Sequence, residues 1–484
     1  MNTDNRLLLA VFLSLLLFFG YTAFFKPKSS TLLENSSEKV FSQKQELDQI
    51  AEISETTDVL KQKETEKFVV TYSETRGYIK SIELLSPKDT LNFENIGLFP
   101  NIDIVSGDLS RQYTAEDKTN RLVFTDLEAG ITKTFIFDGY LITLETETKI
   151  ASPLLLFSVK KDKDVLSQRY QEIFSFDGTG FKKIPLRKTQ ERVFSKNQFS
   201  GARDRYYCAS LLKGDYDIKV NIQKNGDEAL LYLLNPSKKI TLYVGPQIQK
   251  NLQPLGLQKI INYGVFHFIA IIILKMLNFI FFITKSWGFS LITLAVIIYF
   301  ILFPFTAKST KAMNAMKKIQ PEMEKLKEKY KNDPQQMNAA IMKLYKENKV
   351  NPLGGCLPLF FQIPVFIALY QILPKFVELK GSSFLWIKDL SLPDNLFTLP
   401  FSLPVIGNSI NILPIIIMVI SIIQQKVMTS VATDSSAKQQ KAIGLFFAVF
   451  IGVIFYSFPS CLVLYWLIQN LLTLLYQIKT SSKK

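Results

Sequence analysis

Long uncharged apolar runs constrain this chain more than any other feature. Residues 7–25 contain no charged side chain, and about 20 such residues suffice for a helix to cross a hydrocarbon core of ~30 Å. Lys26-Pro27-Lys28 offers no small-residue cleavage site, so an uncleaved anchor is favoured over a signal peptide. Five more runs follow, at 287–305, 354–373, 412–427, 442–458 and 461–478. The sequence therefore predicts a polytopic α-helical membrane protein with six spans.

The lysine distribution predicts how these spans are oriented. The segment 307–350 has 11 Lys against 5 acidic residues, whereas 374–411 has three of each. The loop 428–441 and the tail 479–484 are also basic. Because cytosolic loops are enriched in Lys and Arg, we expect these basic segments and both termini in the cytosol, and residues 26–259 outside.

The apolar run 263–284 is not counted among the spans. If it crossed the membrane, only Lys285 and Ser286 would join it to the next span, and the lysine-rich segment would be forced outside. At 100° per residue, His267, Lys275, Asn278 and Lys285 share roughly 80° of arc. We therefore predict an amphipathic helix over 260–285 that lies at the outer membrane interface.

The outer segment 26–259 has the composition of a soluble domain. It carries 34 basic and 32 acidic residues, a net charge of 34 − 32 = +2. Residues 26–66 are rich in Ser, Thr, Glu and Lys and are predicted to form a flexible linker. From 67 to 259, short β-type runs such as KFVVTYS and ITLYVG alternate with turn residues. These runs predict an all-β antiparallel sandwich.

The basic segment 307–350 is predicted to be a helical hairpin. Met316, Ile319, Met323, Leu326 and Tyr330 recur at spacings of three and four, which is a heptad seam. Asn332-Asp333-Pro334 then breaks the helix, with Asp333 as the cap of the next one. The hairpin lysines are either ordinary positive-inside charge or a docking surface for acidic lipids, ribosomes or nascent chains. The docking lysines are Lys317, Lys318, Lys325, Lys327 and Lys329.

The sequence gives little support for a catalytic or metal-binding function. The chain has one His and three scattered Cys, which disfavours a histidine-rich metal site, a Ser/His/Asp triad and a disulfide framework. No glycine-rich phosphate loop or paired-carboxylate spacing is visible. The excess positive charge lies between apolar runs, so it does not indicate specific nucleic-acid binding. We therefore expect no enzyme activity, no cofactor and no metal.

Polar side chains inside the predicted spans are the candidate functional residues, because such groups must face protein or water. The last span has a stripe of Trp466, Asn470, Thr473 and Gln477 within about 60° of arc. Ser421 and Gln425 lie one turn apart in 412–427, and Gln362 lies between Pro358 and Pro364, which should bend that helix. Helix-to-helix hydrogen bonding and a hydrated cavity are both compatible with this pattern.

Several motifs make the chain resemble the YidC family of membrane protein insertases, in its long bacterial form. They include NYG at 262–264, WGFS at 287–290, FPFT at 303–306, KVNPLGGCLPLFFQIPVFIALY at 349–370, FLWIKDLS at 384–391 and FPSCLVLYWLIQNLLT at 458–473. Further matches are NRLLLA at 5–10, TRG at 75–77 and YVGPQIQ at 243–249.

This resemblance implies an inner-membrane insertase and chaperone with a five-helix core around a hydrophilic groove, open to cytosol and lipid. It also implies an outer β-supersandwich. Nascent membrane proteins are the implied partners, alone or beside the Sec translocon, and the ribosome and the signal recognition particle receptor are candidate hairpin partners. The alternatives are a secondary transporter, for which no matching pair of broken helices is visible, and a membrane-anchored periplasmic carbohydrate-binding protein.

One position departs from the family pattern. The family usually places an Arg in the groove on the first core span, and alignment of WGFS with FPFT puts Tyr299 there in this chain. Residues 287–305 contain no Arg or Lys. We therefore expect groove hydration, rather than a fixed positive charge, to support insertion.

Overall fold

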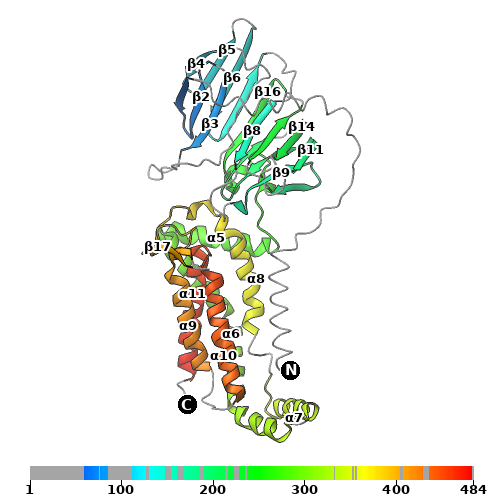
Figure 1. Ribbon diagram of the computed structural model, residues 1–484, viewed down its shortest axis with the longest axis vertical. Coiled ribbons are helices and arrows are strands. Elements are labelled where there is room, and N and C mark those ends of the chain that lie inside the picture. The colour runs from blue at the N-terminus through cyan, green and yellow to red at the C-terminus, as the bar shows by residue number, and fades with distance from the viewer. Residues whose placement is uncertain are drawn as a thin grey trace. The chain divides into compact units, whose positions relative to one another are not determined.

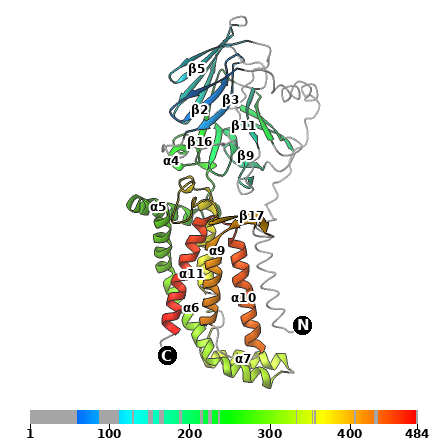
Figure 2. The same ribbon diagram turned by 60° about the vertical axis from the view of Figure 1, so that its left-hand side comes forward.

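The computed structural model describes residues 59–75, 77–85, 112–126, 130–147, 154–160, 168–185, 190–212, 216–222, 228–234, 237–331, 333–351, 354, 357–403, 407–428 and 435–481. The predicted anchor at 7–25 lies outside these residues. The chain forms two compact units. Of the described residues, 59–314 and 354–481 belong to one unit, and 315–351 belong to the other. Figures 1 and 2 show the described elements.

In the described part of the β domain, within the first unit, there are sixteen strands. They are β1 Leu60–Glu64, β2 Phe68–Ser73, β3 Tyr78–Leu84, β4 Thr114–Lys118, β5 Arg121–Asp126, β6 Ile131–Asp138, β7 Leu141–Thr146, β8 Leu154–Lys160, β9 Glu172–Phe176, β10 Phe181–Pro185, β11 Gln190–Asn197, β12 Phe199–Arg203, β13 Tyr207–Leu211, β14 Tyr216–Ile222, β15 Glu228–Leu233 and β16 Lys239–Pro246. The main sheet has the order β10-β9-β12-β13-β16-β7-β6-β5-β4, beside sheets β11-β14-β15-β8 and β1-β2-β3.

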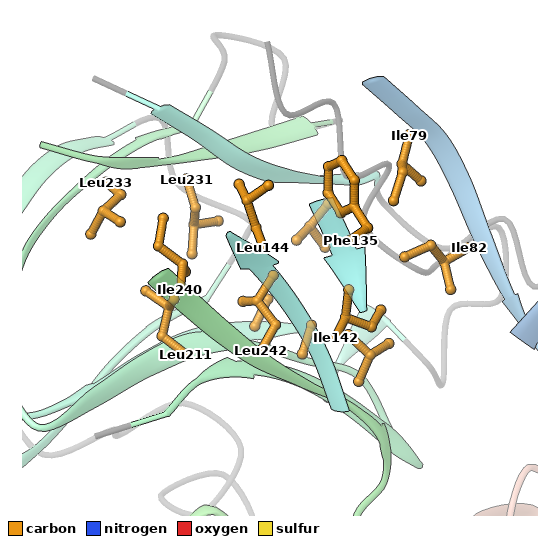
Figure 3. Packing of buried hydrophobic residues seen from close by; sticks show 14 of the residues in the cluster. Ile79, Ile82, Phe135, Ile142, Leu144, Leu211, Leu231, Leu233, Ile240 and Leu242 are labelled. Carbon is orange, nitrogen blue, oxygen red and sulfur yellow. The ribbon is translucent and has the colours of Figure 1, made fainter. Parts of the chain in front are cut away.

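Alternating burial explains why these segments form sheets around one core. In β7 every second residue, beginning with Ile142, is buried, while its neighbours are half-exposed, as expected for a sheet with one covered face. Ile79 of β3, Leu144 of β7, Leu231 of β15 and Leu242 of β16 belong to one buried cluster. Figure 3 shows that such side chains from different sheets point toward one another. The strand pairings among the described residues are antiparallel, as predicted.

The predicted flexible linker ends earlier than the sequence suggested. Residues 60–64, placed in the linker by their Lys- and Glu-rich composition, form β1, and its Leu60 pairs with Ser73 of β2. Four of the five β1 side chains are exposed. An edge strand needs only backbone pairing on one side, so its side chains can be polar, and composition alone did not distinguish it from a linker.

After the β domain, the described residues form seven longer helices and the short helices α4 Gln249–Leu252, η2 Gln258–Ile260, η4 Leu373–Lys375 and η5 Val377–Leu379. The longer ones are α5 His267–Thr284, α6 Trp287–Lys329, α7 Pro334–Glu347, α8 Leu357–Ile372, α9 Ile412–Met428, α10 Ser435–Phe455 and α11 Ser460–Ser481. Among the described residues, α5, α6 and α11 are long and apolar enough to cross a membrane, and the apolar parts of α8, α9 and α10 are shorter.

The helical bundle is apolar both inside and outside. Leu294 of α6, Leu369 of α8 and Leu462 of α11 are fully buried in one cluster. Large apolar side chains are nevertheless exposed on the outer helix faces, including Phe300 of α6 and Phe360 of α8. A water-soluble protein rarely exposes so many, whereas lipid accommodates them without cost.

Helix α5 has three distinct faces. Ala270, Ile273, Leu277 and Ile280 are buried against the bundle. The four polar residues of the predicted stripe, His267, Lys275, Asn278 and Lys285, are all exposed. Beside them lies an exposed apolar face with Phe268, Phe279 and Ile283. Lys285 adopts a left-handed conformation with a φ of 54°, so α5 turns directly into α6.

Helix α8 begins later than predicted. The expected span started at 354, but the helix runs from Leu357. Pro358 therefore occupies the first turn, where a backbone N–H has no helical partner to lose, and it is not an internal break. Pro364 is the proline inside the helix.

The hairpin of α6 and α7 confirms the predicted break and much of the predicted seam. The Asp333 side chain accepts hydrogen bonds from the backbone N–H groups of Gln335 and Gln336, both at 3.0 Å. Ile319 of α6 and Leu344 of α7 are buried in one small cluster, with Met316, Met323 and Leu326 packed against it. The polar loop after α8 also contains a hairpin that was not predicted, β17 Phe397–Leu403 and β18 Gly407–Ile410.

Candidate functional site

The polar stripe of α11 (Trp466, Asn470, Thr473 and Gln477) lies among the helices of the bundle. The Trp466 ring packs against Phe366 of α8 and Phe455 of α10, with centroids 5.1 and 5.5 Å apart. All four stripe residues are half-buried. The first turns of the stripe thus face α8 and α10, and polar groups follow toward the C-terminal end of α11.

Gln362 connects α8 to α11. Its Nε2 donates a hydrogen bond of 2.9 Å to the hydroxyl of Tyr465. Gln469, which the sequence reasoning missed, is also buried and donates to the Ala295 carbonyl of α6 at 2.8 Å. These amides join three helices, and the signal that could have found Gln469 is its place one turn after Tyr465 on the same face.

Helix α9 contributes a second polar contact to α11. Gln424, beside the predicted pair, donates from Nε2 to the Asn470 carbonyl at 2.8 Å. Ser421 and Gln425 are half-buried. Gln425 lies against Gly444 of α10, where a Cβ would come within 1.7 Å of its Nε2. Gln425 therefore faces the α9–α10 contact, so the structure brings Gln424, rather than Gln425, to the stripe.

In the C-terminal part of the stripe, the side-chain hydrogen bonds stay within α11. Asn470 donates to the Trp466 carbonyl and Thr473 to the Gln469 carbonyl, both at 2.8 Å and both within α11. The Gln477 Oε1 is buried and has no hydrogen-bond partner among the described residues. A buried amide oxygen without a donor costs about 1–3 kcal/mol. At this end of the site, the described helices therefore leave a hydrogen-bond acceptor, the Gln477 Oε1, unsatisfied.

Tyr299 does not face the stripe. Its side chain is only 5% exposed, and its hydroxyl donates to the Leu472 carbonyl of α11 at 3.2 Å. At 100° per residue, Leu472 lies roughly 120° around α11 from the middle of the stripe. The hydroxyl at the family's usual Arg position is thus used in the α6–α11 contact.

The five predicted docking lysines differ in solvent exposure. Lys318, Lys325 and Lys329 are exposed and fall within roughly 40° of arc on α6. Lys317 and Lys327 are half-buried on other faces of the helix. The basic face of the hairpin therefore consists of three of the five residues.

These observations define a class of protein. Exposed apolar residues surround a helical bundle, uncharged amides and hydroxyls lie between its helices, and an antiparallel β domain precedes it. Such a chain is an integral membrane protein with a large domain outside the bilayer. The described site residues offer hydrogen-bond donors and acceptors, which suit binding of a peptide chain.

Comparison with known proteins identifies the family. Residues 69–276 match the family described as "YidC periplasmic domain", and residues 279–484 match "60Kd inner membrane protein". The chain belongs to the YidC family of membrane protein insertases. Its β domain is the periplasmic domain of that family, and its helices form the inner-membrane part.

Relatives confirm the match along the chain. "Membrane protein insertase YidC" from Geobacter sulfurreducens is 30% identical over 541 residues, covering 98% of this chain and 97% of the relative. The protein of the same name from Pelobacter propionicus is 36% identical and covers 70% of this chain and 67% of the relative. The solved structure "Active YidC insertase crystal structure with the first transmembrane domain resolved" is 18% identical, with a TM-score of 0.42 over 87% of this chain and 93% of that one.

Proposed function

We propose that this protein inserts nascent membrane proteins into the inner membrane by sheltering their polar segments beside the stripe of α11. The observation that carries this proposal is the buried Gln477 Oε1, which has no hydrogen-bond partner among the described residues. The nearby Asn470 and Thr473 side chains donate to carbonyls of their own helix. A water molecule or the backbone N–H of a passing chain would complete these hydrogen bonds.

The distribution of hydrogen bonds supports a site that is closed at one end and open at the other. Gln362, Gln469 and Gln424 join neighbouring helices around the N-terminal half of α11. In the C-terminal half, Tyr299 bonds the Leu472 carbonyl on another face of α11. On the stripe itself, the Thr473 hydroxyl bonds within α11, and the Gln477 Oε1 has no partner among the described residues. With the C-terminus of α11 in the cytosol, the hydrated groove opens to the cytosol and ends within the bundle.

Physical reasoning explains why such a groove promotes insertion. Each polar group that enters hydrocarbon without a partner costs several kcal/mol. A hydrated groove that reaches partway across shortens the path over which a substrate's polar segment meets that cost. Transfer of the adjoining apolar segment into lipid then drives the step, so no nucleotide is consumed.

The proposed topology has six spans: residues 7–25 and the helices α6, α8, α9, α10 and α11, which form a five-helix core. Both termini face the cytosol, residues 26–259 form a periplasmic linker and β-supersandwich, and 260–285 lies at the interface. The support is the lysine content of 307–350, 11 Lys against 5 acids, because basic loops remain on the cytosolic side.

The basic face of the hairpin is proposed to dock partners at the cytosolic surface. Lys318, Lys325 and Lys329 point from one side of α6, and such a cluster attracts anionic lipids or ribosomal RNA phosphates. The Sec translocon and the signal recognition particle receptor are further proposed partners.

A triple substitution at the free end of the stripe tests the proposed function. Asn470→Leu, Thr473→Val and Gln477→Leu together should reduce insertion at least ~10-fold in a depletion–complementation assay, because the groove loses its polar lining. The matched control replaces the exposed Leu471 and Leu475 of the same helix by Ala. Full insertion by the triple variant would contradict the proposal.

Solvent labelling provides a second arm of this test. Single cysteines at Asn470 and Gln477 should react with a water-soluble maleimide in membranes, whereas one at the buried, bonded Gln469 should not. The native Cys208 and Cys461 are buried free thiols, and Cys356 is replaced by Ser throughout. Unreactive cysteines at both stripe positions would show that the site is dry.

A further inference from the structure

Arg205 lies in the tight turn between β12 and β13 and is almost fully buried, at 2% exposure. The turn itself is rigid. The Asp204 carboxylate accepts hydrogen bonds of 2.6 Å from the backbone N–H groups of Tyr206 and Tyr207, and Gln247 donates to the Asp204 and Tyr207 carbonyls. The β domain thus presents one fixed guanidinium on a short turn.

This guanidinium donates hydrogen bonds to two segments of the chain: the turn directly after α8, and the loop around Ser391. Its Nε donates to the Pro374 carbonyl at 2.5 Å, in η4 directly after α8. Its Nη2 donates to the Ser391 carbonyl at 2.7 Å. Arg205 and both carbonyls belong to the same compact unit.

The Ser391 segment also holds the start of α11. The backbone N–H of Cys461 donates to the Leu390 carbonyl at 2.9 Å, and that of Ser460 donates to the Leu392 carbonyl at 2.8 Å. The consecutive carbonyls of residues 390, 391 and 392 therefore accept hydrogen bonds from Cys461 of α11, from Arg205 and from Ser460 of α11, respectively. Ser460 and Cys461 are both fully buried, so this junction has little room to shift.

We propose that Arg205 is a positioning residue that couples the β domain to the helices α8 and α11 and fixes the separation of these two helices. The Arg205 side chain donates one hydrogen bond to the turn after α8. It donates another to the Ser391 loop, whose neighbouring carbonyls bond the first residues of α11. Since Gln362 lies on α8 and the polar stripe on α11, the β domain thereby helps to define the shape of the candidate site. The consequence for insertion rests on the proposed function, whereas the coupling itself does not.

Arginine suits this role better than lysine. Its planar fork offers several N–H donors in fixed directions, which matches two carbonyls from separate segments. The Tyr206 ring lies 4.9 Å and the Tyr170 ring 6.0 Å from the guanidinium carbon, so aromatic faces also contact the charge. An ammonium group at this position would be shorter and could not reach both carbonyls with the same geometry.

Distance measurements between the two helices test the proposal. Nitroxide labels are placed on the exposed Phe360 of α8 and Leu475 of α11 in the full chain, in lipid nanodiscs. Arg205→Gln should widen the inter-label distance distribution at least two-fold, and Arg205→Lys should give an intermediate width. The matched control is Arg121→Gln, an exposed arginine of β5, which should leave the distribution unchanged.

The outcomes separate this inference from the proposed function. Unchanged distances in Arg205→Gln would overturn the coupling, whatever happens to insertion. If Arg205→Gln does not accumulate, Arg205→Lys decides the question, and a wild-type width in that variant overturns the proposal. Normal insertion by the stripe variants would instead contradict the proposed function and leave the coupling intact.

Discussion

The half-buried Glu172 of β9 pairs with two cations of the β domain. Its Oε1 accepts a hydrogen bond of 2.7 Å from the Arg203 Nε and lies 3.3 Å from the Lys183 Nζ. Arg203 also donates to the Ile260 carbonyl, shortly before α5. Burial alone would raise the pKa of Glu172, but the two cations outweigh it and hold that pKa below its usual value.

Glu172→Gln should destabilise the protein by about 3 kcal/mol at neutral pH, because it leaves the buried Arg203 guanidinium without its carboxylate. Since the folded-state pKa is lowered, the unfolded chain binds this proton more tightly. The stabilisation is complete above about pH 5 and is lost as the pH falls through the folded-state pKa. Thermal unfolding between pH 3 and 7 should therefore show a weaker acid dependence in the variant.

Glu145→Gln is the matched control for this experiment. Glu145 forms an exposed ion pair of 2.8 Å with Lys239, and such pairs contribute little to stability. Identical acid profiles for wild type and Glu172→Gln would contradict the role assigned to Glu172.

Among the helices, α5 combines properties of a span and of an interfacial helix. It is long and apolar enough to cross a membrane. Yet its polar stripe is exposed and adjoins an exposed apolar face, while the third face is buried against the bundle. A helix lying along the interface would expose its polar stripe to water and its apolar face to lipid.

Nitroxide depth measurements distinguish these two arrangements. Phe268 and Phe282 are both exposed, and their separation of 14 positions corresponds to about 21 Å of helix. We expect labels at the two positions to lie at depths within ~5 Å of each other, by the ratio of oxygen to nickel-chelate accessibility. A depth difference near ~20 Å would mean that α5 crosses the bilayer, and the positive-inside argument would then fail.

The chain as a whole is asymmetric in charge, and this asymmetry underlies the proposed orientation. Residues 26–259 carry a net charge of 34 − 32 = +2, and the much shorter segment 307–350 carries 11 − 5 = +6. Arg121 of β5 and Lys343 of α7 are both exposed, so each can report on one side of the membrane.

Labelling of intact spheroplasts checks this orientation. A cysteine at Arg121 should react with a membrane-impermeant maleimide added outside, because the β domain is proposed to be periplasmic. A cysteine at Lys343 should react only after the membrane is disrupted. The reverse pattern would place the hairpin outside and exclude a groove that opens to the cytosol.

Much of the architecture could be predicted from local patterns. The helical hairpin, its break at Asp333 and the strands with clear alternation, such as β5 and β7, follow from periodicity and turn residues. The edge strand β1 and the hairpin β17–β18 could not be predicted, because polar or proline-interrupted segments become strands only when a partner backbone lies beside them. For the site, the stripe on α11 was visible, whereas Gln469 and Arg205 were not.

The sequence by itself determined which segments are apolar enough for lipid, which alternate as strands, and where positive charge accumulates. These properties depend on composition and on spacing along one element. Only the tertiary structure decided that Gln362 bonds Tyr465, that Tyr299 bonds the Leu472 carbonyl, and that the Gln477 Oε1 remains unpartnered. The physical reason is that a hydrogen bond needs a partner within about 3 Å, and residues far apart in the sequence meet at that distance only after the helices have packed.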